Sequence, residues 1–242
     1  MLKSIYAISG IGESLSSLAP TYRRNNIARM KFRARARLPR YHLLMRKMKI
    51  LLTGFNRFGK VRENPSQLIV EEIVRRRLAG LIAEVLPTEF AAAGKRIRAL
   101  IRRHRPDWIF CLGVAQGIPA IHLERIALNL DDTEAPDNAG RIHAAKQIVK
   151  DGPLAYESTL PLEKLRDRLR QRRVPAAISN HAGTYVCNHV FYTARYEVER
   201  LGLNARCGFI HLPGLPSKNS PGMPLAQTIE AVEECLRLVT EV

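Results

Sequence analysis

The sequence reads Ser179-Asn-His-Ala-Gly-Thr-Tyr-Val-Cys-Asn-His189 where a short apolar run ends and a long helical pattern begins. The run 175–178 predicts a buried strand, and the small residues 182–184 predict a turn. The helical pattern extends from about 185 to 201. Cys187 therefore lies in the first turn of a helix that follows a strand, where unpaired backbone N–H groups and the helix dipole favour an anion such as a thiolate. We take Cys187 as a candidate nucleophile.

Strand patterns alternate with helical patterns on both sides of this junction. Asn64-Pro65 predicts the start of one helix, because Asn caps free N–H groups and Pro suits the first helical position. The alternation is typical of a three-layer α/β/α fold with a mostly parallel, twisted sheet flanked by helices on both faces. Active sites of such sheets lie at the carboxyl ends of strands. The other apolar strands are expected at 49–53, 81–86, 108–112 and 206–212.

Three further segments have patterns of their own. Residues 88–104 predict a basic amphipathic helix capped by Thr88. Residues 121–130 alternate between apolar and polar side chains, which predicts a strand or an extended segment. Residues 131–153 are polar and rich in turn-forming residues, so we expect a long excursion outside the core.

Basic residues are concentrated in the first fifth of the 242-residue chain. Residues 1–47 contain 11 Lys and Arg against one acid, a net charge of +10, whereas residues 48–242 contain 28 against 21, a net charge of +7. We interpret 1–47 as a basic, disordered extension or as sequence upstream of a true start at Met48, and 48–242 as the α/β domain. A targeting presequence and a nucleic-acid-binding arm are the alternatives.

Composition excludes several classes of protein. No run approaches the roughly 18 to 20 apolar residues of a transmembrane helix. The spacing of Cys187 and His189, with His181 nearby, is poor for a tetrahedral metal site, and no phosphate-binding glycine signature is present. The four cysteines form no C-x-x-C pair, which favours a reducing, cytoplasmic location. Three of them, Cys111, Cys207 and Cys235, lie in apolar segments and are interpreted as core residues.

A cysteine nucleophile needs a base, and the base needs an orienting group. Among the seven histidines, His211 is best placed, because it ends an apolar strand close to the predicted start of the Cys187 helix. Its alternative role is that of a hydrogen-bonded histidine at the edge of the core. Glu124 interrupts an apolar run, where a carboxylate is costly unless it is paired. It therefore either has a buried partner or points to solvent.

A series of short motifs occurs in a fixed order along residues 48–240. The motifs are Met48-Lys-Ile-Leu-Leu-Thr-Gly-Phe-Asn-Arg-Phe-Gly59, Glu63-Asn-Pro-Ser66, Glu124-Arg-Ile-Ala-Leu-Asn129, Pro136-Asp-Asn-Ala-Gly140, Ser158-Thr-Leu-Pro161, Ala182-Gly-Thr-Tyr-Val-Cys-Asn-His189 and Gly208-Phe-Ile-His-Leu-Pro213. Together they resemble the pyroglutamyl peptidase I (pyrrolidone carboxyl peptidase) family of cysteine peptidases. Residues 1–47 have no counterpart in that family.

The resemblance implies a homotetrameric enzyme that removes N-terminal pyroglutamyl (5-oxoprolyl) residues from peptides through an acyl-enzyme. Cys187 would be the nucleophile, His211 the base and acid, and Glu124 the group that orients His211. Phe55 and Phe58 would line the pocket for the lactam ring. Tyr185 and Val186 would lie beside the nucleophile. No metal or cofactor is needed, and neither a membrane nor a nucleic acid is the expected partner.

Three positions near the expected pocket depart from the family pattern. Val114 stands where an amide is usual, and Ile118 and Glu134 stand where arginines are common. These replacements motivate an alternative hypothesis, a cysteine amidase acting on a related small cyclic amide or acyl substrate. A second alternative is a non-catalytic protein whose basic arm, residues 1–47, binds nucleic acid or anionic lipid.

Overall fold

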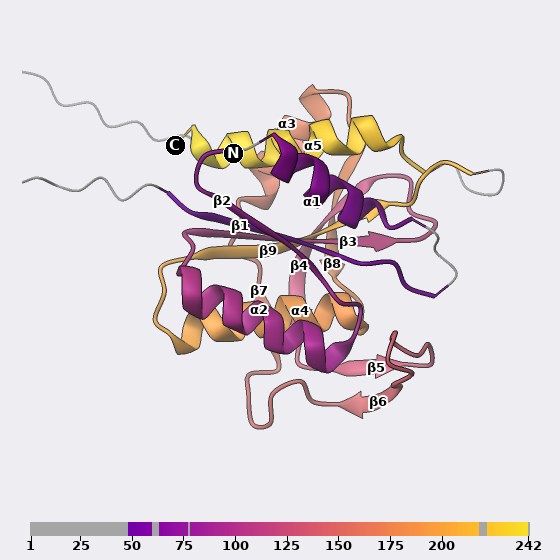
Figure 1. Ribbon diagram of the computed structural model, residues 1–242, viewed down its shortest axis with the longest axis vertical. Helices are drawn as coiled ribbons and strands as arrows, with labels where there is room; N and C mark the ends of the chain where they lie inside the picture. Colours follow the sequence, from indigo (N-terminus) through magenta and orange to yellow (C-terminus); the bar gives the residue numbers. More distant parts are fainter. Residues whose placement is uncertain (1–47, 60–62, 77, 218–221, 242) are drawn as a thin grey trace, which may run out of the picture. The chain divides into compact units, whose positions relative to one another are not determined.

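In the described part of the chain, residues 48–59, 63–76, 78–217 and 222–241, a seven-stranded sheet lies between two layers of helices (Figure 1). The predicted extension 1–47 lies outside these residues. The strands of this sheet are β1 (Ile50–Phe55), β2 (Leu81–Leu86), β3 (Trp108–Ala115), β4 (Ile121–Leu128), β7 (Ala155–Glu157), β8 (Ala176–His181) and β9 (Arg206–Pro213). A separate hairpin pairs β5 (Asp131–Thr133) with β6 (His143–Lys146).

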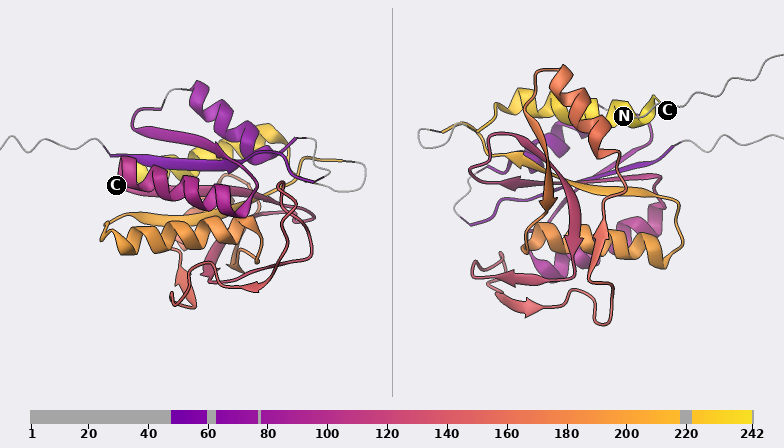
Figure 2. Two further views of the ribbon diagram at one scale, coloured as in Figure 1. Left: turned by 60° about the horizontal axis from the view of Figure 1, so that its bottom comes forward. Right: turned by 180° about the vertical axis from the view of Figure 1, so that it is seen from behind.

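Helices cover both faces of the large sheet, which confirms the predicted three layers. On one face lie α1 (Pro65–Arg75), α3 (Leu162–Gln171) and α5 (Leu225–Thr240), and on the other lie α2 (Phe90–His104) and α4 (Val186–Arg200) (Figures 1 and 2). None of the helices in the described residues is long and apolar enough to cross a membrane.

The sheet is mostly parallel, as predicted, but β4 pairs antiparallel with both β9 and β7. Its strand order is β2-β1-β3-β9-β4-β7, and β8 pairs with β4. Strands β2, β1, β3 and β9 are parallel, whereas β4 runs antiparallel to β9 and parallel to β8. The connection 116–120 is too short for the crossover that a parallel strand requires, so β4 returns in the opposite direction. Figure 2 shows how strongly β4 and β8 are twisted relative to β9.

The core consists of two apolar clusters, one on each face of the sheet. Alternate residues of β1 belong to different clusters: Leu52 packs on the side of α1 and α5, and Leu51 packs on the side of α2 and α4. This two-sided burial is the reason the parallel strands are continuously apolar in sequence. Cys111, Cys207 and Cys235 are buried in these clusters, as predicted.

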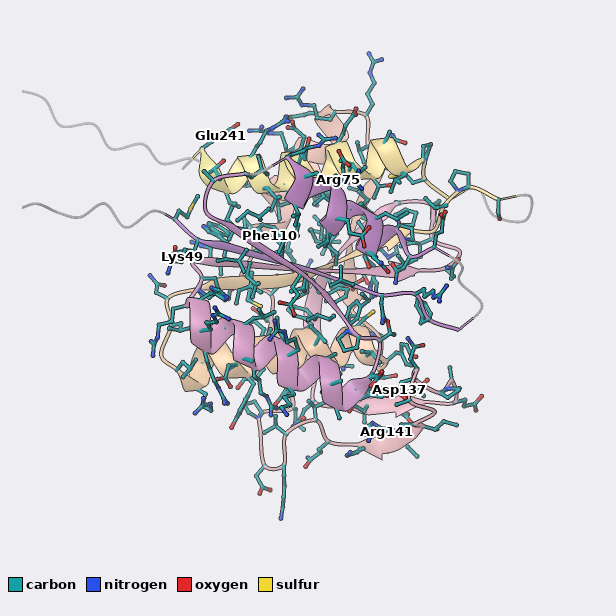
Figure 3. All side chains as sticks on the ribbon, in the orientation of Figure 1. Lys49, Arg75, Phe110, Asp137, Arg141 and Glu241 are labelled. Atoms are coloured by element: carbon teal, nitrogen blue, oxygen red, sulfur yellow. The ribbon has the colours of Figure 1, made fainter. Side chains whose placement is uncertain are left out.

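Of the two predicted helix caps, one is confirmed and the other is wrong. Asn64 caps α1 as expected, since its side chain accepts a hydrogen bond from Ser66 N. The prediction for Thr88 was wrong. Helix α2 begins at Phe90, and Phe90 N donates to Asp137 Oδ2 at 3.0 Å, an acceptor from the excursion (Figure 3). Thr88 instead donates to the Asn56 backbone oxygen at 2.9 Å.

The excursion 131–153 is more closely tied to the core than its polar sequence suggests. Asp131 and Asp137 are buried, and Asp137 also accepts hydrogen bonds from the backbone of Ala139 and Arg141. Since these carboxylates satisfy backbone and imidazole groups from elsewhere in the fold, the excursion is part of the structure that surrounds the start of α4.

Candidate active site

The turn between β8 and α4 delivers Cys187 to the start of a helix, as the sequence predicts. Gly183 adopts a φ of +73°, a left-handed conformation that favours glycine. Gly183 N donates to His181 Nδ1 at 3.1 Å, and Thr184 Oγ1 donates to the Asp132 backbone oxygen. Helix α4 then begins at Val186 without a side-chain cap and without an acid in its first turn. The Cys187 thiol therefore lies among unpaired helix N–H groups.

Asn188 holds the first turn of α4 against the end of β4. Its Oδ1 accepts from Leu128 N at 2.8 Å, and its Nδ2 donates to the backbone oxygens of Leu128 and Leu130, both at 2.9 Å. The side chain is fully buried. Because β4 also carries Glu124, these bonds fix the position of Cys187 relative to that carboxylate. Sequence analysis missed Asn188, although its place directly after the cysteine was a usable signal.

His211 and Glu124 face each other across the antiparallel pair β4 and β9. In this register His122 lies opposite His211, and Glu124 lies opposite Phe209. His211 Nδ1 is 2.7 Å from Glu124 Oε1, and the two residues are 8% and 1% exposed. Glu124 thus has a buried partner rather than a solvent-facing position.

Gly113 of β3 provides room for the thiol beside His211. It lies opposite His211 in the parallel register, and a Cβ at this position would lie 2.8 Å from Cys187 Sγ. Burial alone would lower the pKa of His211, but the charge of Cys187 and hydrogen bonds to Cys187 and Glu124 raise that pKa to about 9. The raised pKa favours the imidazolium form of His211 beside the Cys187 thiol.

The other three thiols have a different environment. Burial raises the pKa of Cys111 and Cys235 to about 12, and it raises the pKa of Cys207 well above its ordinary range. Cys187 is the partly exposed member of the four. The nucleophilic form of a cysteine is the thiolate, so the geometry favours Cys187 as the reactive thiol.

The four residues predicted to line the pocket differ in burial. The Phe58 and Tyr185 rings are both half-buried, with centroids 6.2 Å apart. Phe55 is buried in the core, 6.4 Å from the Phe209 ring, which in turn packs on His211. Val186 is fully buried. The structure therefore brings Phe58 and Tyr185 together, and it buries Phe55 and Val186 in the core.

A second histidine–carboxylate cluster lies on the excursion side of α4. Asp131 Oδ2 is 2.8 Å from His189 Nδ1 and 3.2 Å from His143 Nδ1. The Phe90 ring stacks on His143, with centroids 4.3 Å apart. No group of three or more His, Cys, Asp or Glu side chains in the described residues is arranged to hold a metal ion. His189 is thus engaged by Asp131, a residue that sequence analysis did not single out.

The three positions that depart from the family pattern differ in exposure. Val114 is buried in β3 directly after Gly113, Ile118 is half-buried in the following connection, and Glu134 is exposed. Of the three positions, Val114 is therefore the one adjacent in sequence to Gly113, which lies beside the Cys187 thiol.

A thiol beside a histidine–carboxylate pair, carried by a three-layer α/β/α fold, is characteristic of a hydrolase. Comparison with known proteins narrows this class. The pyroglutamyl peptidase family model matches residues 48–241, and the chain belongs to this family of peptidases. The resemblance drawn from the sequence motifs is therefore confirmed.

Relatives and solved structures agree over most of the chain. It is 40% identical over 192 residues to the pyrrolidone-carboxylate peptidase of Bacillus licheniformis, covering 78% of this chain and 89% of the relative. A mutant pyrrolidone carboxyl peptidase from the hyperthermophile Pyrococcus furiosus is 34% identical with a TM-score of 0.76, covering 80% of this chain and 99% of that chain. Pyroglutamyl peptidase I from Bacillus amyloliquefaciens is 36% identical with a TM-score of 0.74, covering 78% and 93%.

Proposed function

We propose that this protein removes N-terminal pyroglutamyl residues from peptides by a Cys-His-Glu triad. The observation that carries the proposal is the buried His211–Glu124 pair, 2.7 Å apart. The Cys187 thiol is hydrogen-bonded to the same imidazole. The names of the relatives, pyrrolidone-carboxylate peptidases, support the choice of substrate.

The first half of the reaction forms an acyl-enzyme. The Cys187 thiolate attacks the pyroglutamyl carbonyl carbon, a C–S bond forms, and the carbonyl electron pair moves to oxygen. Backbone N–H groups at the start of α4 are suited to donate to this oxyanion. As the C–N bond breaks, the His211 imidazolium gives its proton to the leaving amine. Glu124 accepts from Nδ1 and so keeps the other ring nitrogen facing the thiol.

The second half of the reaction hydrolyses the thioester. Neutral His211 takes a proton from water, and the oxygen attacks the acyl carbon. The C–S bond then breaks, which returns the electron pair to Cys187 and releases pyroglutamate. The imidazolium formed in this step restores the starting ion pair.

The aromatic residues suit a substrate without a free amine. A pyroglutamyl residue has its α-nitrogen closed in a lactam, so the pocket needs no carboxylate to bind an ammonium group. Phe58 and Tyr185 would contact the ring, with Phe55 and Val186 behind them as the apolar wall. Apolar walls with a few polar groups are the usual lining of such pockets.

A direct test uses the purified full chain and a fluorogenic pyroglutamyl amide. We expect release of the fluorophore, and no release from the corresponding prolyl or glutamyl amide. Cys187→Ser should remain folded and lose the activity. Absence of turnover by the wild-type chain, or equal turnover of the prolyl amide, would contradict the proposal.

A second candidate function is a cysteine amidase for a related small cyclic amide. It is favoured by Val114, an apolar side chain buried next to Gly113 at the position where the family usually has an amide. Under this hypothesis the enzyme hydrolyses a small lactam or acyl amide faster than a pyroglutamyl peptide. Comparing kcat/KM for the two substrates decides between the candidates.

The assembly and location are part of the same proposal. The resemblance to the family supports a homotetramer, and four cysteines without a disulfide support a cytoplasmic enzyme. Light scattering on the purified protein measures the number of subunits directly. A monomer with full activity would contradict the proposed assembly.

A further inference from the structure

A cavity lies between α2 and α4, apart from the candidate active site. Its volume is about 330 Å³, and its walls include Gly94, Lys95, Arg98 and Arg102 of α2, Ile148 of the excursion and His189 of α4. No carboxylate is among the lining residues. The walls therefore combine three cationic side chains with an imidazole in a small space.

Arg102 and Arg98 differ in the hydrogen bonds that their guanidinium groups make. Arg102 Nε donates to Glu197 Oε1 at 2.6 Å, so this guanidinium has a partner on α4. The Nε of Arg98 is buried without a hydrogen-bond acceptor among the described residues. A buried N–H group without an acceptor costs free energy, and such groups are rare in folded proteins. Arg98 lines the cavity, so an anion bound there would supply acceptors for its guanidinium.

His189 adds a directional group to the same cavity. Its Nδ1 faces Asp131 Oδ2 at 2.8 Å, so this nitrogen donates to the carboxylate and Nε2 is the ring nitrogen left for another contact. Nε2 lies against Gly94, where any Cβ would collide with it. A glycine within a helix costs about 1 kcal/mol relative to alanine. The glycine at position 94 is explained by the space that the His189 imidazole requires.

We propose that this cavity binds a phosphate group, either inorganic phosphate or the phosphate of a small monoester. The Arg98 Nε–H, Lys95 and Arg102 would donate to the phosphate oxygens, as charge-assisted hydrogen bonds. A hydrogen phosphate ion has both an O–H donor and acceptor oxygens, so it can bond His189 Nε2 whether or not that nitrogen carries a proton. Sulfate lacks that donor and should bind more weakly. The buried position of the Arg98 Nε favours a small anion over a nucleic acid.

The test measures thermal stability of the full chain at constant ionic strength with inorganic phosphate, glycerol phosphate, sulfate or chloride. A ligand that binds only the native state raises Tm in a saturable way. We expect this for phosphate, with at least about tenfold weaker binding of sulfate. Tighter binding of glycerol phosphate would identify a monoester as the preferred source, and tighter binding of inorganic phosphate would identify the free anion.

Matched variants of α2 separate a site from general charge. Arg98→Gln and the exposed Lys95→Gln should each weaken phosphate binding at least about tenfold, whereas Arg103→Gln, on the same helix but outside the cavity, should bind as the wild type does. Calorimetry should give one phosphate per chain. Equal Tm shifts with all four anions, equal affinity in all variants or no saturable shift would overturn the proposal.

Discussion

Two buried histidine–carboxylate pairs lie near the start of α4, and they differ in what surrounds them. In one, His211 Nδ1 is 2.7 Å from Glu124, and in the other, His189 Nδ1 is 2.8 Å from Asp131. Both carboxylates are 1% exposed. Glu124 bonds His211 alone and has a second buried oxygen without a partner among the described residues, whereas Asp131 bonds two imidazoles. The same pair of groups can therefore face a thiol or a neighbouring helix.

Helix geometry explains the division. His189 follows Cys187 by two positions, and side chains two apart on a helix do not face each other. Its ring therefore lies toward Gly94 of α2, away from the thiol. His211 comes from β9, where the register sets it opposite Gly113 and beside Cys187. The function of a histidine here depends on what its second nitrogen faces, and not on the carboxylate behind it.

The largest expected effect comes from removing the Cys187 thiol. Cys187→Ala should lower kcat for a pyroglutamyl amide by at least about 10⁴-fold, because loss of a covalent nucleophile leaves only binding and oxyanion stabilisation. The buried Cys235→Ala is the matched control and should keep its activity. If Cys187→Ala hydrolyses the pyroglutamyl amide as fast as the wild type does, the proposed roles of both histidine pairs are wrong.

Neutralising each carboxylate tests the comparison itself. Glu124→Gln should lower kcat/KM by about 10³-fold or more, because His211 loses its orientation and charge partner. Asp131→Asn should lower Tm, since one residue bonds two imidazoles, while kcat/KM changes less than about tenfold. Both variants need activity and thermal unfolding measured together. Equal losses of activity would show that the two pairs are not distinct in function.

Filling the two glycine positions tests the packing behind each pair. A Cβ at Gly113 would lie 2.8 Å from Cys187 Sγ and 2.7 Å from Phe209 Cζ. Gly113→Ala should lower the free energy of unfolding by about 1–3 kcal/mol and also lower kcat, because overpacking displaces the thiol. Gly94→Ala should destabilise by a similar amount through His189 and affect kcat less. Denaturant unfolding and steady-state kinetics separate the two results.

The smallest expected effect is on pH dependence. The proposed acylation requires His211 as imidazolium; burial lowers the pKa of His211, but Cys187 and Glu124 raise it to about 9. On the alkaline limb of the pH profile, kcat/KM should therefore fall about tenfold per pH unit above pH 9. The associated stability should be fully present below the unfolded histidine pKa of about 6.5 and be lost as pH rises through 9.

Glu124→Gln sharpens this result. Because Glu124 contributes to raising the pKa of His211, the alkaline limb of its residual kcat/KM should move to lower pH. Asp131→Asn is the control, and its alkaline limb should stay at the wild-type position. An unchanged limb in Glu124→Gln would contradict the assignment of that limb to His211.

Local signals in the sequence predicted much of this molecule. Asn64-Pro65 predicted the start of α1, and the junction around Gly183 predicted the start of α4 with Cys187 in its first turn. These features depend on neighbouring residues and their backbone preferences, so they can be interpreted without the fold. The motif resemblance also singled out Glu124 and His211 before their contact was known.

Other parts of the site depend on contacts between distant residues. Asn188 bonds Leu128, 60 positions away, and Asp137 replaces Thr88 as the acceptor at the start of α2, 47 positions from Phe90. The position of Asn188 directly after Cys187 marks it as part of the site, but the neighbouring sequence does not indicate which distant groups either residue bonds. The polar excursion looked separate from the core for this reason.

By itself, the sequence determined the thiol, its helix and the alternation of strands and helices, because short-range preferences and apolar periodicity are enough for these. The tertiary structure alone made the choice of partners for His211, the histidine that the sequence favoured. That choice required β4 to return antiparallel to β9, which set Glu124 against His211 and left His189 to Asp131. Strand pairing sets side-chain neighbours across long separations, and a pattern of single residues does not contain that register.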